Sequence, residues 1–406
     1  MTRAQHEASG AGRRAAAGAP PSGESGGCPG ARAGDRLDLL FIAGNARSLI
    51  ANRGALIRHL LARGQRVGAL VPAADYLPEV ETLGIPIWQF DMRRTGVSPL
   101  HDARTAAELF RHLRALRPRA VFCYTVKPIV YGGPAARLAG VPAVYSMVTG
   151  LGHAFTTESL RARAIRAVVT RLYRAGMAAS TRVFFQNPDD ERELLDRGIL
   201  RDPAKVVRVN GSGVELDRYP RRAVPRGRPV FLFVGRLLTE KGIAEFCEAA
   251  RIVADEAPEA RFVAVGPHDP ALPHAVSAEA LARWRRTGPV ELVGGVADVR
   301  PWLEQCTVLV LPSYREGTPR SVLEAMSVGR AVITCDAPGC RETVVDGVNG
   351  FLVPPRQVAP LASAMRRFLA DPELAVGMGA ESRRIAESKY DVELVNSVIT
   401  EAMGLS

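Results

Sequence analysis

Short, mostly apolar runs alternate with amphipathic stretches along most of the 406-residue chain. The first run covers residues 37–44 and ends in Gly44, and a stretch with one apolar helical stripe follows it, made of Leu49, Leu56, Ile57, Leu60 and Leu61. Further runs predict strands at 67–71, 120–124, 141–148, 183–186 and 206–209. Such alternation is typical of a parallel sheet covered by helices on both faces, so residues 37–218 are predicted to form one α/β domain.

A proline-rich and charged segment then interrupts the pattern, and we interpret residues 219–229 as an interdomain linker. The alternation resumes with strands predicted at 229–234, 260–265, 290–293, 308–311 and 331–334 and a helix at 243–256. A second α/β domain is therefore expected at 230–390. Two such domains place a ligand cleft between them, at the carboxyl ends of their strands. A last helix at 391–403, within the segment 391–406, is expected to cross back onto the first domain.

The first 36 residues are rich in Ala, Gly, Arg, Ser and Pro and lack periodic apolar positions, which predicts a disordered tail. No apolar segment follows Arg13 and Arg14, so we expect no secretory signal. No run approaches the roughly 18 apolar residues that a membrane span needs. The expected location is the cytoplasm.

Composition and charge exclude some functions but select no partner. The six cysteines form neither a CxxC pair nor a Cys/His cluster, so we expect reduced thiols and no metal site. The net charge of +11 is compatible with nucleic acid, an anionic membrane surface or phosphorylated ligands. Because no zinc finger, aromatic RNA-binding motif or helix-turn-helix is present, we expect no nucleic-acid partner.

The segment 312–326 carries the most specific pattern for chemistry. A buried strand ends at Leu311, a glycine-containing loop follows, and a helix is predicted to begin near Pro319. The free N–H groups and the dipole of a first helical turn form an anion site. Glu316 in the loop and Glu324 in the helix are eight positions apart. A carboxylate accepts two hydroxyl hydrogen bonds, so one can face a sugar ring and the other a ribose.

A second pattern, at 233–242, places Arg236 and Lys241 in the turn beyond a predicted strand that ends at Val234. Both side chains can project into the cleft from the carboxyl end of the strand. An arginine offers a planar fork for phosphate oxygens and a lysine a mobile point charge. We expect the pair to stabilise the charge of a departing diphosphate in place of a metal ion.

At these residues the chain resembles glycosyltransferase family 4. The Glu-x7-Glu element corresponds to Glu316 and Glu324, and the Gly-Arg…Lys-Gly element to Gly235, Arg236, Lys241 and Gly242. Other segments resemble the branch of PglA-like and capsule or O-antigen glycosyltransferases, namely 124–128, 131–132, 148–152, 185–188, 210–214, 338–343 and 349–354. The resemblance spans about residues 37–390.

The resemblance implies the GT-B fold, two Rossmann-like domains facing a central cleft, and a retaining, metal-independent transfer from a UDP-sugar, often a UDP-N-acetylhexosamine. The implied acceptor is a polyprenyl-diphosphate-linked sugar at the inner membrane face, in surface polysaccharide synthesis. No cofactor is implied. Arg236 and Lys241 would hold the diphosphate, Glu324 the ribose, and Glu316 the donor sugar. The segment after Glu316 would contribute contacts to donor sugar and phosphate, at Gly317, Thr318, Pro319, Arg320 and Ser321.

The resemblance also implies positions away from these two motifs. The backbone of an expected loop, Asn52-Arg53-Gly54, would approach the diphosphate, and the base would lie near Val293 and Gly295. Many family members carry a histidine near the donor sugar, where this chain has His153 just after the 149–152 segment; it is a candidate cleft residue or a loop residue without chemistry.

Lys127 follows a strand end and is our candidate for the acceptor diphosphate, against a structural role. The predicted helix at 160–174 has one apolar and one arginine-rich face, which suits an anionic membrane surface or a solvated face equally.

No nucleophile is evident, so the expected mechanism is a front-face displacement in which the leaving phosphate oxygen takes the acceptor proton. Two other functions remain open at this point. A UDP-N-acetylglucosamine 2-epimerase has the same layout but needs acid/base carboxylates that we do not identify in the first domain. The other is a non-catalytic nucleotide-sugar-binding regulator.

Overall fold

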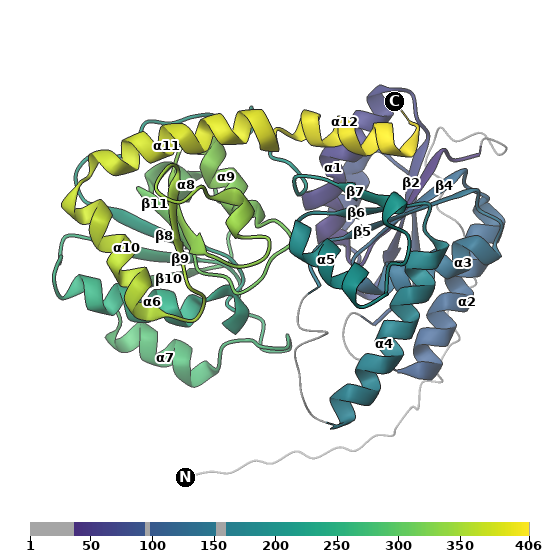
Figure 1. The fold of residues 1–406 in the computed structure, drawn as a ribbon, viewed down its shortest axis with the longest axis horizontal. Coiled ribbons are helices and arrows are strands. Elements are labelled where there is room, and N and C mark those ends of the chain that lie inside the picture. Colours follow the sequence, from purple (N-terminus) through teal and green to yellow (C-terminus); the bar gives the residue numbers. More distant parts are fainter. Residues whose placement is uncertain (1–35, 94–97, 152–159, 406) are drawn as a thin grey trace, which may run out of the picture. The chain divides into compact units, whose positions relative to one another are not determined.

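The computed structural model describes residues 36–93, 98–151 and 160–405, with the backbone alone for residues 75 and 160–167. The tail predicted for residues 1–36 lies outside this part, apart from Arg36, and so does His153. The described residues form two α/β domains, each built on a parallel sheet (Figure 1).

The sheet of the first domain has seven strands in the order β3-β2-β1-β4-β5-β6-β7, and every neighbouring pair is parallel. In β1, Leu39 lies between Val67 of β2 and Ala120 of β4. The strands are β1 Leu39–Ile42, β2 Val67–Pro72, β3 Ile87–Phe90, β4 Ala120–Tyr124, β5 Ala143–Val148, β6 Arg182–Phe185 and β7 Val206–Arg208.

Helices cover both faces of this sheet because its strands are buried on both sides. Leu109, Tyr173 and Leu194, from α2, α4 and α5, pack on one face, and Leu56 of α1 packs on the other. Asn45 caps α1 by accepting a hydrogen bond from the backbone N–H of Ser48. The helices are α1 Ala46–Ala62, α2 Pro99–Leu116, α3 Gly133–Leu138, α4 Leu160–Ala179 and α5 Pro188–Asp196.

The second domain has a six-stranded parallel sheet in the order β10-β9-β8-β11-β12-β13 and a single hydrophobic core. Its strands are β8 Val230–Val234, β9 Arg261–Val265, β10 Val290–Gly294, β11 Val308–Leu311, β12 Ala331–Cys335 and β13 Gly350–Val353. Its helices are α6 Ile243–Ala254, α7 Ala278–Thr287, α8 Arg300–Gln305, α9 Arg320–Val328, α10 Val358–Ala370 and α11 Glu373–Ile385.

Two strands, β3 and β13, were not predicted from the hydrophobic pattern. Both are edge strands of four residues. In β3 only Phe90 is buried, so the strand lacks the continuous apolar run that marks a central strand. β13 begins with Gly350, whose added Cβ would lie 1.8 Å from the carbonyl oxygen of Val332, so only glycine fits this close strand contact.

The chain passes between the domains twice, and the two passages are hydrogen-bonded to each other. The N–H of Val214 donates to the carbonyl of Tyr390 at 2.8 Å, and the N–H of Val392 donates to the carbonyl of Val214 at 3.1 Å. Beyond this bridge α12, Val392–Met403, returns to the first domain. There the hydroxyl of Tyr145 donates to the carbonyl of Met403 at 2.7 Å, and Ile399 packs among β1 and α1.

Candidate active site

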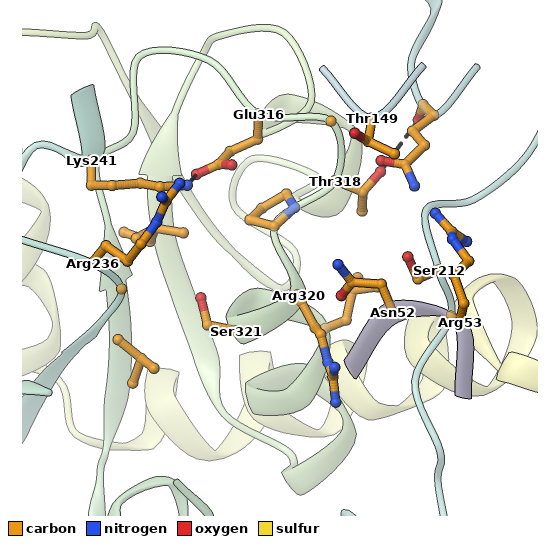
Figure 2. A pocket seen from close by; sticks show the side chains of 18 residues that line it. Asn52, Arg53, Thr149, Ser212, Arg236, Lys241, Glu316, Thr318, Arg320 and Ser321 are labelled. Carbon is orange, nitrogen blue, oxygen red and sulfur yellow. Dashed lines mark hydrogen bonds and ion pairs between the residues drawn. The ribbon is translucent and has the colours of Figure 1, made fainter. Parts of the chain in front are cut away.

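A cavity of about 430 Å³ lies where the strand ends of both domains meet. The second domain contributes residues after β8 and β11 and the first turn of α9, and the first domain contributes α1 and segments after β5, β6 and β7 (Figure 2). Its polar side chains belong to Asn52, Arg53, Thr149, Gln186, Ser212, Arg236, Lys241, Glu316, Thr318, Arg320 and Ser321.

Arg236 and Lys241 lie together at one end of the cavity (Figure 2). A 3-10 turn, Thr239–Lys241, follows β8 and ends at Gly242, whose φ is 73°. An added Cβ at Gly242 would lie 2.2 Å from the carbonyl oxygen of Pro312, so the glycine lets this turn pack directly on the start of the next loop. As a result the ammonium of Lys241 forms an ion pair with Glu316, whose side chain is 13% exposed. The structure thus brings together the three residues that we expected to carry the reaction.

The first turn of α9 opens onto the same cavity. Pro319 precedes the helix, and the first N–H groups to bond within it belong to Val322 and Leu323, both to the carbonyl of Pro319. The backbone N–H groups of Arg320 and Ser321 form no backbone hydrogen bond in the described part of the chain. Together with the positive end of the helix dipole, they form an anion-binding position beside Arg236 and Lys241.

The first domain holds the loop that carries Glu316. The side-chain amide of Asn187 donates to the carbonyls of Glu316 and Gly317, at 3.3 and 3.1 Å. An added Cβ at Gly317 would lie 2.4 Å from Oε1 of Gln186 and 2.6 Å from the carbonyl oxygen of Thr149. Only a glycine allows this approach. The conformation of this loop, residues 312–319 and called the donor loop from here on, therefore depends on contacts from both domains.

Glu324 is separated from the cavity, although it is one helix turn away from Arg320. Its carboxylate accepts a hydrogen bond from the hydroxyl of Tyr219 at 2.9 Å and pairs with Nε of Arg320 at 2.8 Å. The residue is 7% exposed and does not line the cavity. A ribose that binds to Glu324 must therefore displace part of the Arg320 contact.

The prediction of a loop at residues 52–54 is wrong. Asn52, Arg53 and Gly54 lie inside α1, because the apolar stripe and the Asn45 cap begin the helix at Ala46. Their N–H groups are engaged in the hydrogen bonds of the helix interior, so the backbone there does not offer free donors to a diphosphate. Asn52 and Arg53 nevertheless line the cavity, whereas Gly54 does not, and a Cβ added at Gly54 would meet the side chains of Arg58 and Leu83.

Lys127, our candidate for the acceptor diphosphate, has a partner within the first domain. Its ammonium lies 3.1 Å from Oδ1 of Asp102 in the first turn of α2, and the two side chains are 17% and 7% exposed. Burial, together with Asp102, also raises the pKa of the neighbouring Tyr131 to about 12. Lys127 does not line the cavity, and the pair instead attaches α2 to the end of β4.

Val293 and Gly295, the expected base-binding residues, lie at the end of the edge strand β10. Neither lines the cavity. An added Cβ at Gly295 would lie 3.2 Å from Cβ of Pro267, so this position packs against the segment after β9.

Several cavity residues had no assigned role in the sequence. Thr149, Gln186 and Ser212 follow the ends of β5, β6 and β7, and all three line the cavity. The same rule that located Arg236 applies to them, because parallel strands present their carboxyl ends at one edge. No pattern in the sequence indicated that Asn187 contacts the donor loop.

Two family models match this chain, one for each domain. The model described as "Glycosyl transferase 4-like domain" matches residues 53–211, and the model described as "Glycosyl transferases group 1" matches residues 228–371. A solved structure of sucrose-phosphate synthase from Thermosynechococcus elongatus superposes with a TM-score of 0.75 at 19% identity, covering 91% of this chain and 98% of that one. At this identity the superposition supports the fold alone.

Several relatives are similar in sequence, among them one from Campylobacter jejuni and one from Escherichia coli. The N,N'-diacetylbacillosaminyl-diphospho-undecaprenol alpha-1,3-N-acetylgalactosaminyltransferase of Campylobacter jejuni is 25% identical over 368 residues, 87% of this chain and 95% of the relative. The UDP-Gal:alpha-D-GlcNAc-diphosphoundecaprenol alpha-1,3-galactosyltransferase of Escherichia coli is 27% identical over 319 residues, 75% of this chain and 79% of the relative. Together, the two family models match most of both domains, and the two relatives are similar over at least three quarters of the chain. The chain therefore belongs to the family 4 glycosyltransferases and has their GT-B fold.

Proposed function

We propose that this glycosyltransferase moves a hexose or N-acetylhexosamine from a UDP-sugar to a polyprenyl-diphosphate-linked sugar, with retention of the anomeric configuration and without a metal ion. The names of the two relatives support this substrate class, since both describe transfer to a diphosphoundecaprenol-linked sugar. One observation carries the proposal: Arg236, Lys241 and the first turn of α9 meet at one cavity. Two cations and a helix N-terminus suit a leaving diphosphate.

Donor binding would exchange the partner of Lys241. In the structure its ammonium pairs with Glu316. A diphosphate beside Arg236 competes for that ammonium, and the carboxylate of Glu316 then becomes available to accept hydrogen bonds from sugar hydroxyls. The same residues would therefore recognise both ends of the bond that breaks.

The reaction follows from this arrangement. The bond between the anomeric carbon and the β-phosphate oxygen breaks, and Arg236 and Lys241 stabilise the charge that develops on that oxygen. The acceptor hydroxyl approaches from the same face and forms the new bond to the anomeric carbon. Its proton passes to the departing phosphate oxygen, so the step needs no separate protein base. The protein mainly positions the reactants and supplies positive charge.

An apolar groove in the first domain supports a peripheral contact with an anionic membrane, where the acceptor would reside. The groove is lined by Phe110, Tyr131, Leu138 and Leu172, from α2, α4 and the residues around α3. Phe110 is 36% exposed and Leu138 77%. Exposed arginines on the same helices suit an anionic lipid surface, at Arg104, Arg111, Arg114 and Arg171.

None of the described helices is both long and apolar enough to cross a bilayer. Co-sedimentation with anionic vesicles tests the proposed surface contact. We expect a Leu138→Glu variant to bind less well than the natural chain, because the added carboxylate is repelled by the lipid. Equal binding of both proteins would argue against a membrane contact through this groove.

The activity is tested by incubating UDP-sugars with a polyprenyl-diphosphate-linked acceptor and identifying the product by mass and by the NMR coupling of its anomeric proton. We expect Lys241→Ala to lower kcat/KM by about 100-fold, as the loss of a key charge-stabilising donor does. Lys205→Ala is the matched control, because Lys205 is half-buried in a turn of the first domain and does not line the cavity, and it should keep full activity.

Three outcomes would contradict the proposal. Near-normal turnover of Lys241→Ala would remove the role of the cation. Loss of activity in EDTA, restored by a divalent ion, would show that a metal is required. An inverted product would reject retention, and epimerisation of UDP-GlcNAc without any acceptor would favour the epimerase, which the relatives do not support.

A further inference from the structure

Arg53 carries a buried charge without a counter-ion on the first-domain wall of the cavity. The residue is 1% exposed, and its Nε is buried with no hydrogen-bond partner. Among the described residues, no carboxylate pairs with its guanidinium and no side chain or carbonyl accepts a hydrogen bond from it. Its backbone lies within α1.

Two aromatic rings are the groups that face the guanidinium. Its Cζ lies 5.3 Å from the ring centre of Tyr124 and 5.9 Å from that of Phe122. These cation–π contacts are favourable but supply no full negative charge. Burial lowers the pKa of Arg53 to about 10, which leaves the group protonated at neutral pH. A charge in this environment is therefore desolvated and largely uncompensated.

Arg330 is a second buried arginine in this chain, and its hydrogen bonding differs from that of Arg53. It is also fully buried, at 0% exposure. Its guanidinium donates to the carbonyls of Leu303, Arg222 and Glu304, at 2.9, 3.0 and 3.0 Å. Arg330 is thus satisfied by the protein alone, whereas the unpaired donor of Arg53 indicates that its partner comes from outside the chain.

The position of Arg53 defines the chemistry of that partner. Arg53 lines the cavity that Arg236 and Lys241 also line, and it lies across the cavity from them (Figure 2). A guanidinium is the side chain best matched to a phosphate oxygen pair. We propose that Arg53 binds a phosphate oxyanion of a diphosphate ligand from the first-domain wall, opposite the two cations of the second domain.

This inference rests on the proposed function, which supplies two diphosphates: that of the nucleotide donor and that of the lipid-linked acceptor. Both present the same oxyanion, and the experiment separates them. Calorimetry measures UDP binding to the full chain and to Arg53→Met and Arg53→Lys, and steady-state kinetics measures KM for the acceptor. Loss of a charged hydrogen bond is expected to change one of these constants by about tenfold or more.

If the donor is the partner, Arg53→Met weakens UDP binding and leaves the acceptor KM unchanged. If the acceptor is the partner, UDP binding is unchanged and the acceptor KM rises. In both cases Arg53→Lys should recover part of the loss, because it keeps the charge. Unchanged UDP affinity and unchanged acceptor KM in a folded Arg53→Met protein would overturn the inference.

The ligand-free melting temperature distinguishes a binding role from a structural one. Removing an uncompensated buried charge should leave Tm equal or higher in Arg53→Met, whereas Arg330→Met should lower it because carbonyl groups lose their donors. If Arg53→Met lowers Tm as strongly as Arg330→Met, the side chain is structural and the inference fails.

A second measurement does not depend on the folding of an Arg53 variant. In the Arg236→Ala/Lys241→Ala protein, inorganic pyrophosphate should still raise Tm, because Arg53 and the first turn of α9 remain in place. No such shift would count against an oxyanion site at Arg53. The Lys241→Ala kinetics test the proposed function separately, so the two ideas fail independently.

Discussion

Nη2 of Arg315 lies 2.5 Å from Oδ1 of Asp190, which joins the donor loop of the second domain to α5 of the first. The side chain of Asp190 is fully buried, and Arg315 also contacts Glu193 at 2.6 Å. Asn187, which caps α5, completes the arrangement by donating to the carbonyl of Gly317. Because Glu316 lies between Arg315 and Gly317, these contacts fix its position from both sides.

Arg315→Met should therefore impair catalysis more than donor binding. The change leaves the Asp190 carboxylate buried and unpaired, which costs about 3 kcal/mol or more of stability. We expect kcat to fall while the affinity for UDP, held by Arg236 and Lys241, changes little. Kinetics and calorimetry on the same preparation measure the two effects.

Arg341→Met is the matched control for Arg315→Met. Arg341 contacts Asp189 at 3.1 Å in the same interface, but the side chains are 38% and 21% exposed. Exposed pairs contribute about 1 kcal/mol or less, so this variant should keep most of its activity. Equal losses in kcat for the two variants would mean that Arg315 has no special positioning role.

Gly317→Ala tests whether the donor loop needs its close contact with the first domain. The added methyl would lie 2.6 Å from the backbone carbonyl oxygen of Thr149, which cannot turn aside as a side chain can, so the two domains must separate locally. We expect transfer to be lost and UDP binding to be retained. Gly377→Ala serves as the control, since nothing lies within 4 Å of its added Cβ, and it should gain about 1 kcal/mol from the helix preference of alanine. Normal turnover of Gly317→Ala would show that the contact is dispensable.

Lys127→Met separates a structural role from acceptor binding. Breaking the buried pair with Asp102 is expected to cost about 3–5 kcal/mol, measured by denaturant unfolding. Asp102→Asn should cost a similar amount, because it breaks the same pair from the other side. The acceptor KM should remain unchanged in any folded Lys127 variant. A raised KM with unaffected stability would instead support our original assignment of Lys127 to the acceptor diphosphate.

Asp38 should make stability depend on pH. Burial opposes ionisation of its carboxyl, but hydrogen bonds and charge from Arg66, together with the charge of Arg119, hold its pKa below the usual value. A lowered folded-state pKa contributes stability that is present above the unfolded pKa of about 3.9 and is lost as the pH falls through the folded value. Asp38→Asn should thus be less stable than the natural chain at neutral pH.

The deficit of Asp38→Asn should shrink in acid, as the natural carboxyl is itself protonated. Denaturant unfolding at neutral pH and at a pH of about 3 measures the difference. Asp217→Asn, at an exposed position, should show little effect at either pH. A pH-independent deficit in Asp38→Asn would assign the loss to packing and not to charge.

The sequence by itself determined the two α/β domains and the parts of the site that follow directly from strand ends. The runs before Gly235 and Pro312 are local signals, because buried strands are continuously apolar and glycine and proline mark the turn and helix start beside them. Arg236, Lys241, Glu316 and the first turn of α9 were therefore predicted together.

Tertiary structure alone decided how these parts are held and which other charges join them. Arg315 and Asp190 are 125 positions apart, Asn187 and Gly317 are 130 apart, and no local pattern specifies such contacts. The partner of Lys127 and the burial of Arg53 likewise depend on how helices pack on the sheet. Periodicity records which face of an element is buried, but the neighbour it meets is set by the packing of the whole chain.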